Sequence, residues 1–221
     1  MLAVQDGEKA YLEKDFVRAR EIWEPIAERG DAEAEAWLGA LYANGLGVEQ
    51  DAARAFDFYR RSAEHGNPLA ANNVGAMYAK GDGVARDPSR GASWFLHAAE
   101  CGDALGQFNY AVALTKGIGV DVDVVEAVRW YRRAAESGHY PSQARLGYCY
   151  AKGLGVANDP VEAFVWLSLA SRHGVGLAMA ELEELVKSMS GDQKAAAQQR
   201  LSKWATSSEG SADFLPKAVG L

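Results

Sequence analysis

The sequence has few of the features on which enzymes and membrane proteins usually depend. Only two of its 221 residues are cysteines, which excludes a Cys-rich metal site. No apolar run approaches the roughly 18 residues that a membrane span requires, and the first residues have neither the basic head nor the apolar core of a signal segment. We therefore predict no membrane insertion and, for the chain as written, a cytoplasmic location. If an upstream signal peptide has been removed, the prediction becomes a periplasmic or exported protein.

Basic residues are also scarce. Lys and Arg number 23 against 30 Asp and Glu, which gives a formal net charge of −7. A protein that binds the phosphate backbone normally has a basic stripe or a strongly basic isoelectric point, so nucleic acid is not an expected partner. Residues 1–35 hold ten acidic and five basic side chains, and an acidic end favours solubility and opposes end-to-end stacking.

The most informative feature that is present is a repeat of fixed length. Four Gly-X-Gly-Val loops follow one another at steps of 36 residues. A period of this size indicates one supersecondary unit stacked on copies of itself, because a single helix pair cannot bury its apolar face alone. The paired glycines of the four loops are Gly45 and Gly47, Gly81 and Gly83, Gly117 and Gly119, and Gly153 and Gly155.

Each repeat has the pattern of two helices. Before the loop, apolar and small residues recur at i, i+4, i+5 and i+8, as in Ala34, Leu38, Gly39 and Tyr42, which is typical of a buried helical stripe. After the loop comes an aspartate that we expect to cap a second helix, and the unit ends in a glycine suited to a left-handed helix stop. The four capping aspartates are Asp51, Asp87, Asp123 and Asp159. The pattern predicts an all-α solenoid of stacked antiparallel helix pairs.

Residues 34–48 read Ala-Glu-Ala-Trp-Leu-Gly-Ala-Leu-Tyr-Ala-Asn-Gly-Leu-Gly-Val, and the pattern continues through Asp51, Ala55, Tyr59, Ala63 and Gly66. This pattern resembles the Sel1-like repeat (SLR) family, part of the tetratricopeptide-repeat-like superfamily, over residues 31–174. The resemblance implies a right-handed α-superhelix whose first helices line a concave surface. It also implies a bacterial adaptor in signalling, secretion, envelope or virulence-related assemblies, and similar bacterial chains are often exported.

The repeat register divides the chain into four parts. Residues 1–30 lack the glycine loop and are similar to a shortened tetratricopeptide helix pair. The pattern predicts capping helices over 175–205, where Ser190 and Gln193 resemble a capping box, and a flexible tail over 206–221 with Phe214, Leu215 and Pro216 as a docking point. The four Sel1-like repeats lie between these ends at 31–66, 67–102, 103–138 and 139–174. The third repeat departs from the family pattern at Tyr110, Ala111 and Leu114, which affects local packing rather than the fold.

No catalytic or cofactor motif emerges from the remaining residues. The loop Gly45-Leu46-Gly47 follows a helix and is followed by Gln50 where a dinucleotide motif needs glycine, so it is not a phosphate cradle. The four histidines lie in different units without metal-ligand spacing, and we interpret them as exposed or helix-capping: His65, His97, His139 and His173. Solenoid units touch only their neighbours, so we expect no disulfide between Cys101 and Cys149. We predict no enzyme activity, no cofactor and no metal.

A binding surface is predicted on the first helix of each repeat. Positions that the core does not claim, at spacing i, i+4 and i+7, are Trp37, Leu41 and Asn44; Asn73, Met77 and Lys80; Asn109, Ala113 and Lys116; and Arg145, Cys149 and Lys152. Amide and basic groups suit peptide carbonyls and carboxylates, although lysine near a helix end also complements the dipole. The candidate groove residues are Trp37, Asn73, Lys80, Asn109, Lys116, Arg145 and Lys152.

The sequence therefore predicts a non-catalytic scaffold or adaptor that binds a protein or peptide segment with acidic or amide groups, while leaving the oligomeric state open. Two alternatives follow from the resemblance. One is a regulatory, periplasmic partner of a membrane sensor or of a secretion or envelope assembly. The other is a hydrolase, because a cysteine-rich branch of the family has been linked to β-lactam binding or hydrolysis. That branch carries a cysteine pair in each unit, which this chain lacks.

Overall fold

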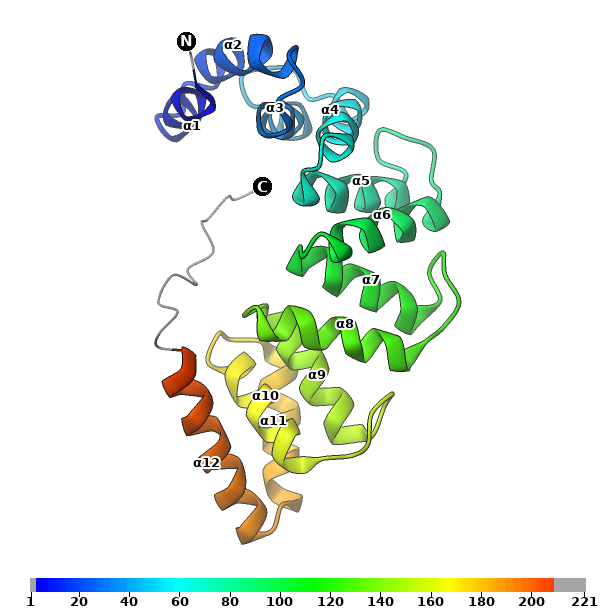
Figure 1. Ribbon diagram of the computed structural model, residues 1–221, viewed down its shortest axis with the longest axis vertical. Helices are drawn as coiled ribbons and strands as arrows, with labels where there is room; N and C mark the ends of the chain where they lie inside the picture. Colours follow the sequence, from blue (N-terminus) through cyan, green and yellow to red (C-terminus); the bar gives the residue numbers. More distant parts are fainter. Residues whose placement is uncertain (1–2, 209–221) are drawn as a thin grey trace. The chain divides into compact units, whose positions relative to one another are not determined.

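The computed structural model describes residues 3–208, without the side chains of residues 205–208, and every regular element in that range is an α-helix (Figure 1). The helices are α1 (Val4–Leu12), α2 (Phe16–Ala27), α3 (Ala32–Asn44), α4 (Ala52–Glu64), α5 (Pro68–Lys80), α6 (Pro88–Glu100), α7 (Ala104–Lys116), α8 (Val124–Glu136), α9 (Tyr140–Lys152), α10 (Pro160–Ser171), α11 (Gly176–Ser188) and α12 (Gly191–Ser208). None of the helices in the described part of the chain is long and apolar enough to cross a lipid bilayer.

The chain forms two compact units, which we describe separately. The N-terminal unit contains the described residues up to Ala113 together with Gly117–Asp121, and the C-terminal unit contains Leu114–Lys116 and the described residues from Val122 onward. In the N-terminal unit α1 packs on α2, α3 on α4 and α5 on α6, and in the C-terminal unit α9 packs on α10. Successive pairs meet through α2 and α3, α4 and α5, α8 and α9, and α10 and α11. The predicted all-α stack of helix pairs is confirmed.

We call α3, α5, α7, α9 and α11 the A helices, and α4, α6, α8 and α10 the B helices. Each A helix from α3 to α9 ends in a glycine in the left-handed region, for example Gly81 with φ of 81°. The second glycine of each loop has a further reason to be glycine. A Cβ at Gly83 (φ 68°) would overlap the backbone carbonyl of Ala52 at the start of α4. The loop therefore packs closely on the preceding repeat, which only glycine permits.

Aspartate side chains cap the B helices. The carboxylate of Asp51 accepts a hydrogen bond from the backbone N–H of Arg54 at 3.0 Å, and Asp87, Asp123 and Asp159 make the same contact in α6, α8 and α10. Three A helices are also capped by side chains that the sequence analysis did not single out: Asp31, Asn67 and Asp103. The equivalent residue of α9 is His139, which makes no such cap.

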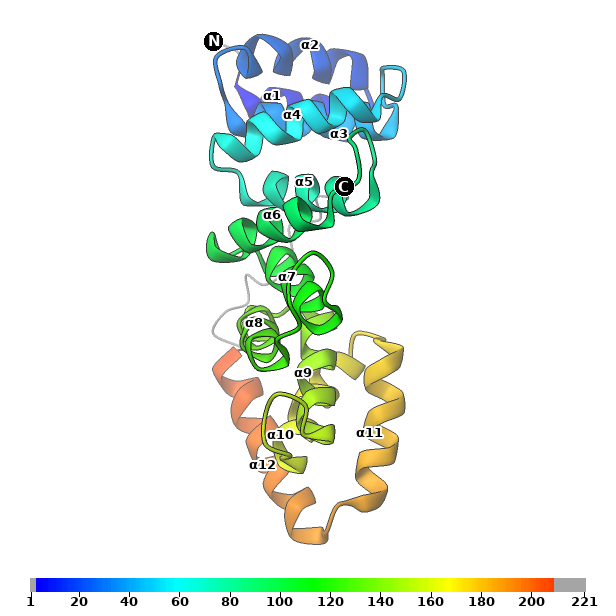
Figure 2. The ribbon, with the colours of Figure 1, turned by 90° about the vertical axis from the view of Figure 1, so that its right-hand side faces the viewer.

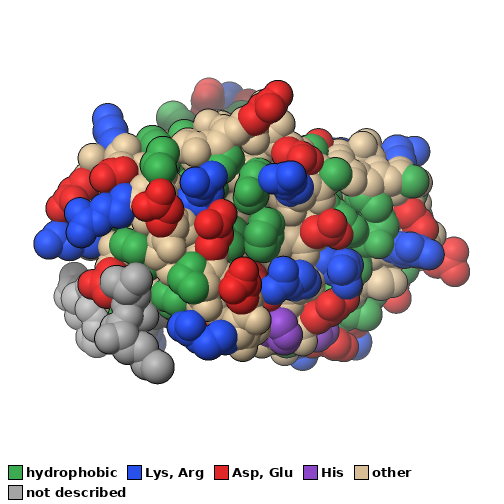
Figure 3. Space-filling model, turned by 90° about the horizontal axis from the view of Figure 1, so that it is seen from above, with side chains coloured by type: hydrophobic (Ala, Val, Ile, Leu, Met, Phe, Trp, Pro, Cys, Tyr) green, Lys and Arg blue, Asp and Glu red, His purple; other side chains and the backbone are tan. Residues whose placement is uncertain are grey.

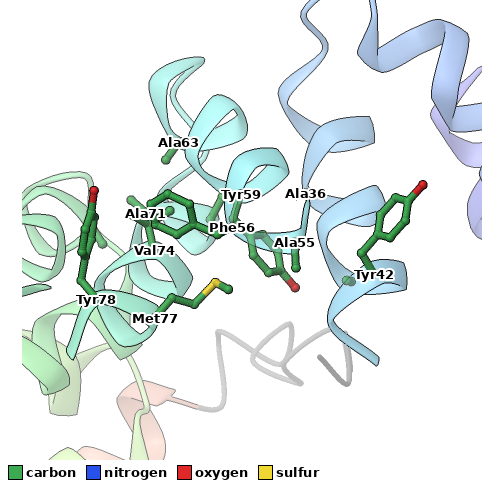
Figure 4. Close-up of a cluster of buried hydrophobic side chains, with 13 residues drawn as sticks. Ala36, Tyr42, Ala55, Phe56, Tyr59, Ala63, Ala71, Val74, Met77 and Tyr78 are labelled. Carbon is green, nitrogen blue, oxygen red and sulfur yellow. The ribbon is translucent and has the colours of Figure 1, made fainter. Parts of the chain in front are cut away.

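The core of the N-terminal unit consists of aromatic side chains separated by alanine and glycine. Figure 4 shows the cluster that α3, α4 and α5 build, with Phe56 and Tyr59 from α4 at its centre. The Phe56 ring meets the Tyr78 ring edge-on, with the two centroids 5.2 Å apart. A Cβ at Gly39 would come within 2.8 Å of the Tyr59 ring. Small residues in the A helices therefore let the large B-helix side chains approach the backbone, as the sequence predicts.

The two ends of the chain are built differently from the repeats. Trp23 of α2 is fully buried, donates its indole N–H to the Val4 carbonyl at 3.0 Å, and stacks on Trp37 of α3. At the other end α10 lies between α11 and α12 (Figure 2). The capping box forms, since the Ser190 N–H donates to the Gln193 side chain at 2.9 Å and the Gln193 N–H donates to the Ser190 hydroxyl at 3.2 Å.

The predicted C-terminal boundary needs one correction. The sequence analysis ended the last helix near residue 205, whereas α12 continues to Ser208; helix ends differ by a residue or two between criteria. The rest of the predicted tail, including Phe214, Leu215 and Pro216, lies outside the described residues.

Candidate functional site

The A helices share one register, so their positions can be compared directly. Each has 13 residues, and their first residues lie 36 positions apart. The sixth residues are Trp37, Asn73, Asn109, Arg145 and Glu181, and the thirteenth are Asn44, Lys80, Lys116, Lys152 and Ser188. The register extends to α11, which lies outside the four predicted repeats.

One part of the predicted surface is wrong. Leu41, Met77, Ala113 and Cys149, the tenth residues of their helices, were expected to lie outside the core, yet all four are buried. For example, α5 packs on both α4 and α6, and α9 packs on both α8 and α10, which leaves a narrower free strip than on a helix that packs on one side only. Of the remaining predicted positions, the thirteenth residues of α3 to α9 and Arg145 are exposed, whereas the sixth residues Trp37, Asn73 and Asn109 are half-buried.

In the N-terminal unit, three candidate groove residues have different surroundings: Trp37 on α3, and Asn73 and Lys80 on α5. Trp37 is half-buried, because its ring stacks on Trp23 with centroids 5.0 Å apart and also lies 5.1 Å from the Tyr11 ring. It is part of the packing of the first helix pair. Asn73 is half-buried, and Lys80 is exposed at the end of α5.

Asn109 of α7 belongs to the same unit and has an internal partner. Its side-chain amide donates to the Asn72 carbonyl oxygen at 2.8 Å. Asn72 is only 3% exposed, so this contact satisfies a buried polar group and links α5 to α7. Asn109 therefore contributes to the packing between repeats.

In the C-terminal unit, Lys116 and Arg145 are exposed, whereas Lys152 is engaged by the chain itself. The Lys152 ammonium lies 3.0 Å from the carboxylate of Glu181 on α11. The hydrogen bond to Glu181, and then its charge, raise the pKa of Lys152. Among the basic candidates of this unit, Lys152 therefore already has its positive charge paired with a carboxylate of the chain itself.

The sequence analysis missed a buried acid. Glu35, the fourth residue of α3, is fully buried; it pairs with Arg61 of α4 at 2.7 Å, and its other carboxylate oxygen lies 2.7 Å from Nδ1 of His65, the residue that ends α4. Arg61 also donates to the Ala27 carbonyl at 3.0 Å. The contact between Glu35 Oε1 and Arg61 lacks the alignment of a hydrogen bond.

A structural role for the Glu35 position follows from its equivalents in later repeats. Gln107 and Gln143 stand at the same register position and are also buried. Each donates its side-chain amide to a carbonyl near the end of the preceding B helix, Ala99 at 3.3 Å and Ala135 at 3.2 Å. Polar residues at this position of a buried face in three of the four repeats were the sequence signal for this role; the equivalent residue of α5 is Ala71.

The histidines do not gather at one place. His65 contacts Glu35, whereas His97 lies edge-on to Trp94 with centroids 5.8 Å apart, and His173 stacks on Tyr140. Burial lowers the pKa of His139 to about 4, so this side chain is neutral at pH 7. Within residues 3–208 no three His, Cys, Asp or Glu side chains are grouped to hold a metal ion.

The B helices carry a second surface feature. In the N-terminal unit a hollow between α4 and α6 is lined by Ala63, Glu64, Ser93, Trp94 and His97. Trp166 is the equivalent of Trp94 in α10, and there Trp204 of α12 packs edge-on against it, with ring centroids 5.5 Å apart.

Acidic and basic side chains are interspersed with apolar ones over the face shown in Figure 3. The excess negative charge therefore does not gather into one acidic patch on that face.

Comparisons with known proteins agree with this geometry. The family model described as Sel1 repeat matches residues 1–31, 32–67, 68–103, 104–139 and 141–175. A search of the curated proteins finds no match. The crystal structure of a Sel1 repeat protein from Oxalobacter formigenes is 31% identical with a TM-score of 0.77, and the match covers 82% of this chain and 75% of that one.

Two further solved structures are similar. The protective antigen c5321 of uropathogenic Escherichia coli, which displays an SLR fold, is 31% identical with a TM-score of 0.78 over 86% of this chain. The match covers 41% of that longer chain. The immunity protein Pa5087 from Pseudomonas aeruginosa, 19% identical with a TM-score of 0.50 over 88% of this chain and 81% of that one, shares the fold alone. Sel1 repeats typically serve as scaffolds for protein–protein interaction. With five matched repeats along its length, the chain belongs to the Sel1 repeat family.

Proposed function

We propose that this protein is a non-catalytic scaffold that binds a segment of a partner protein through Asn73, Lys80, Lys116 and Arg145, at the sixth and thirteenth positions of its A helices. One observation carries the proposal. From α3 to α9 these positions contain no acidic residue, although the chain has a net charge of −7. An acidic protein that keeps amide and basic groups on one repeated strip is suited to a partner that offers carbonyl and carboxylate oxygens.

The chemistry of recognition follows from the side chains. Asn73 offers an amide, Lys80 and Lys116 offer ammonium groups, and Arg145 offers a guanidinium with several fixed donors. An extended or helical peptide presents backbone carbonyls and acidic side chains at regular intervals, which a repeated strip can meet within each unit. Single exposed charge pairs contribute little, so affinity requires several of these contacts together.

Helix stability offers a competing explanation for the lysines. Lys80, Lys116 and Lys152 are the last residues of α5, α7 and α9, where a cation complements the helix dipole. The two explanations differ in outcome, because a dipole effect alters stability and leaves binding unchanged. Lys9 provides a matched control, since it is exposed in the last turn of α1 and lies outside the A helices.

The test is a selection from a library of random linear peptides against the wild-type protein, followed by fluorescence anisotropy with the selected peptides. We expect enrichment of Asp and Glu, and a loss of affinity of about three- to tenfold in Lys80→Glu or Lys116→Glu. Lys9→Glu should retain wild-type affinity. Equal affinity in all three variants, with lower melting temperatures only, would assign the lysines to helix stability and reject the proposal.

The two alternative functions have separate tests. A thiol hydrolase would need a reactive cysteine. Burial raises the pKa of Cys149 to about 11, so this thiol is a poor nucleophile, which leaves the exposed Cys101 as the candidate. Turnover of ester, amide or β-lactam substrates, abolished by one side-chain substitution, would overturn the scaffold proposal. A regulator of a membrane sensor would be a scaffold in the periplasm, and the unprocessed N-terminus in the native cell would identify that case.

A further inference from the structure

The pairing of Lys152 with Glu181 shows how the charge of an A-helix lysine is paired with a carboxylate on the next A helix. Lys152 is the last residue of α9, and Glu181 is the sixth residue of α11, the next A helix. Their ammonium nitrogen and carboxylate oxygen lie 3.0 Å apart, and the Glu181 side chain is 20% exposed. The thirteenth position of one A helix therefore reaches the sixth position of the next.

One repeat earlier the same two positions hold two cations. Subtracting 36 from 152 and from 181 gives Lys116 at the end of α7 and Arg145 as the sixth residue of α9. Both belong to the C-terminal unit. Neither side chain forms an ion pair with a residue that the structure describes. Where the chain supplies a carboxylate for Lys152, it supplies a second positive charge for Lys116.

The charge of Arg145 also acts on two other side chains of the C-terminal unit. The guanidinium acts on the pKa values of Tyr131 and Cys149, lowering both against the larger effect of burial, which raises them. The Tyr131 hydroxyl lies 3.5 Å from the hydroxyl of Thr115, the neighbour of Lys116. Tyr131, whose pKa is raised by burial, thus contacts the last turn of α7 as a neutral side chain.

We propose that Lys116 and Arg145 form a receptor for a carboxylate of the partner segment, an Asp or Glu side chain that takes the place Glu181 takes one repeat later. The inference rests on the proposed scaffold function and specifies its ligand chemistry. Arg145 offers paired N–H donors to the two carboxylate oxygens, and Lys116 adds a compact charge. Because the site is exposed, its affinity falls as salt concentration rises.

The first experiment measures carboxylate binding directly. The probe is the peptide Ac-Ala-Glu-Leu-Glu-Glu-NH2, which reproduces residues 180–184 of α11, and its control replaces each Glu by Gln. In NMR titrations at low salt we expect the Arg145 Nε–H signal to shift saturably with the Glu peptide and to stay in place with the Gln peptide. Lys116→Gln should weaken the interaction about two- to fivefold, and Lys9→Gln, at an exposed lysine of α1 outside the A helices, should leave it unchanged. Identical shifts with both peptides, or no effect of Lys116→Gln, would overturn the inference.

A second experiment transplants the site. Glu181→Arg places at the end of α9 the same pair of cations that Lys116 and Arg145 provide, so the number of Glu-peptide sites should rise from one to two, with a new shift at Lys152. Circular dichroism checks that the variant is folded. An unchanged stoichiometry in the folded variant would show that two cations at these positions do not make a receptor.

The experiments distinguish a failure of the carboxylate receptor from a failure of the scaffold function. If peptides selected on the wild-type protein bind Lys116→Gln and Arg145→Gln with unchanged affinity, the carboxylate receptor is wrong and the scaffold function stands. If the wild-type protein selects no peptide and the Arg145 signal does not respond to the Glu peptide, both the scaffold function and the receptor are wrong.

Discussion

Glycine has two structural roles in this repeat, to adopt a left-handed backbone conformation and to leave space for a neighbouring segment. Single substitutions can distinguish the two roles. Gly83 has a φ of 68°, and a Cβ there would overlap the Ala52 carbonyl. Gly102 has a φ of 88°, with nothing within 4 Å of a Cβ. Gly102 thus requires only the backbone conformation, whereas Gly83 also requires the space.

We therefore predict that Gly102→Ala costs about 1 kcal/mol of unfolding free energy and that Gly83→Ala costs about 2 to 4 kcal/mol. Urea unfolding followed by circular dichroism measures both values. The two glycines lie in the same compact unit, so each is the control for the other. Equal losses of unfolding free energy in the two variants would mean that the loop containing Gly83 is not closely packed against α4.

His139 stands where α3, α5 and α7 have a capping side chain. Its pKa is lowered to about 4 by burial, below the ordinary value of about 6.5. Between these values the unfolded chain binds the proton more readily than the folded chain, so stability is lost as the pH falls from about 6.5 toward 4. Asn67, at the equivalent position of α5, caps its helix by accepting the Ala70 N–H at 3.1 Å.

From this we predict that His139→Asn raises the unfolding free energy by about 0.5 to 1.5 kcal/mol at pH 7, although it removes the contact of His139 with Ser142 at 2.8 Å. Thermal melts at pH 7 and pH 5 should show a smaller pH dependence in the variant than in the wild type. A variant that is less stable than the wild type at both pH values would contradict the missing-cap explanation.

At the scale of elements, α12 closes the end of the stack through two contacts with α10. Trp204 packs edge-on against Trp166, and Arg200 pairs with Glu162. Glu162 also accepts the Trp166 indole N–H at 3.1 Å. These contacts explain why α12 lies along α10.

The corresponding prediction is that Trp204→Ala loosens α12 from α10. We expect faster hydrogen exchange in α12 and a loss of about 2 kcal/mol or more from the C-terminal unit, because a large aromatic contact is removed. Gln198→Ala, at an exposed position of the same helix, is the control and should change little. Unchanged exchange in α12 of the Trp204 variant would show that the contact does not hold the helix.

The elements that could be predicted from sequence are those whose geometry is set locally. A left-handed glycine such as Gly81 and a capping aspartate such as Asp87 act within a few residues of the chain, so their spacing was enough to predict both helices of each repeat. The burial of Leu41 and Met77 depends on packing against other elements. The helical period alone could not distinguish these positions from the exposed Lys80.

The site was less predictable for the same reason. Lys116, Arg145 and Lys152 look alike in the repeat register, yet Lys152 is neutralised by Glu181 of α11, a helix outside the predicted repeats. Asn109 was predicted to contact a partner, and its bond to the buried Asn72 depends on how α5 and α7 pack. Predicting these contacts requires the register of neighbouring helices in space.

At the scale of the whole molecule, this is a repeat protein whose A helices from α3 to α9 have amide, basic or aromatic side chains and no acid at the sixth and thirteenth positions. The N-terminal unit contributes Asn73 and Lys80, and the C-terminal unit contributes Lys116 and Arg145. Lys80, Lys116 and Arg145 are exposed, and Asn73 is half-buried. A partner segment with acidic residues is the ligand that this charge distribution selects.

The central claim is tested most directly by mapping, through backbone and side-chain NMR shifts, where a selected acidic peptide binds the full chain. The account predicts that the largest shifts fall on the sixth and thirteenth positions of the A helices, including Lys80 and Arg145, and that they diminish as salt is added. Shifts confined to the B helices, such as those around Trp94, would contradict it.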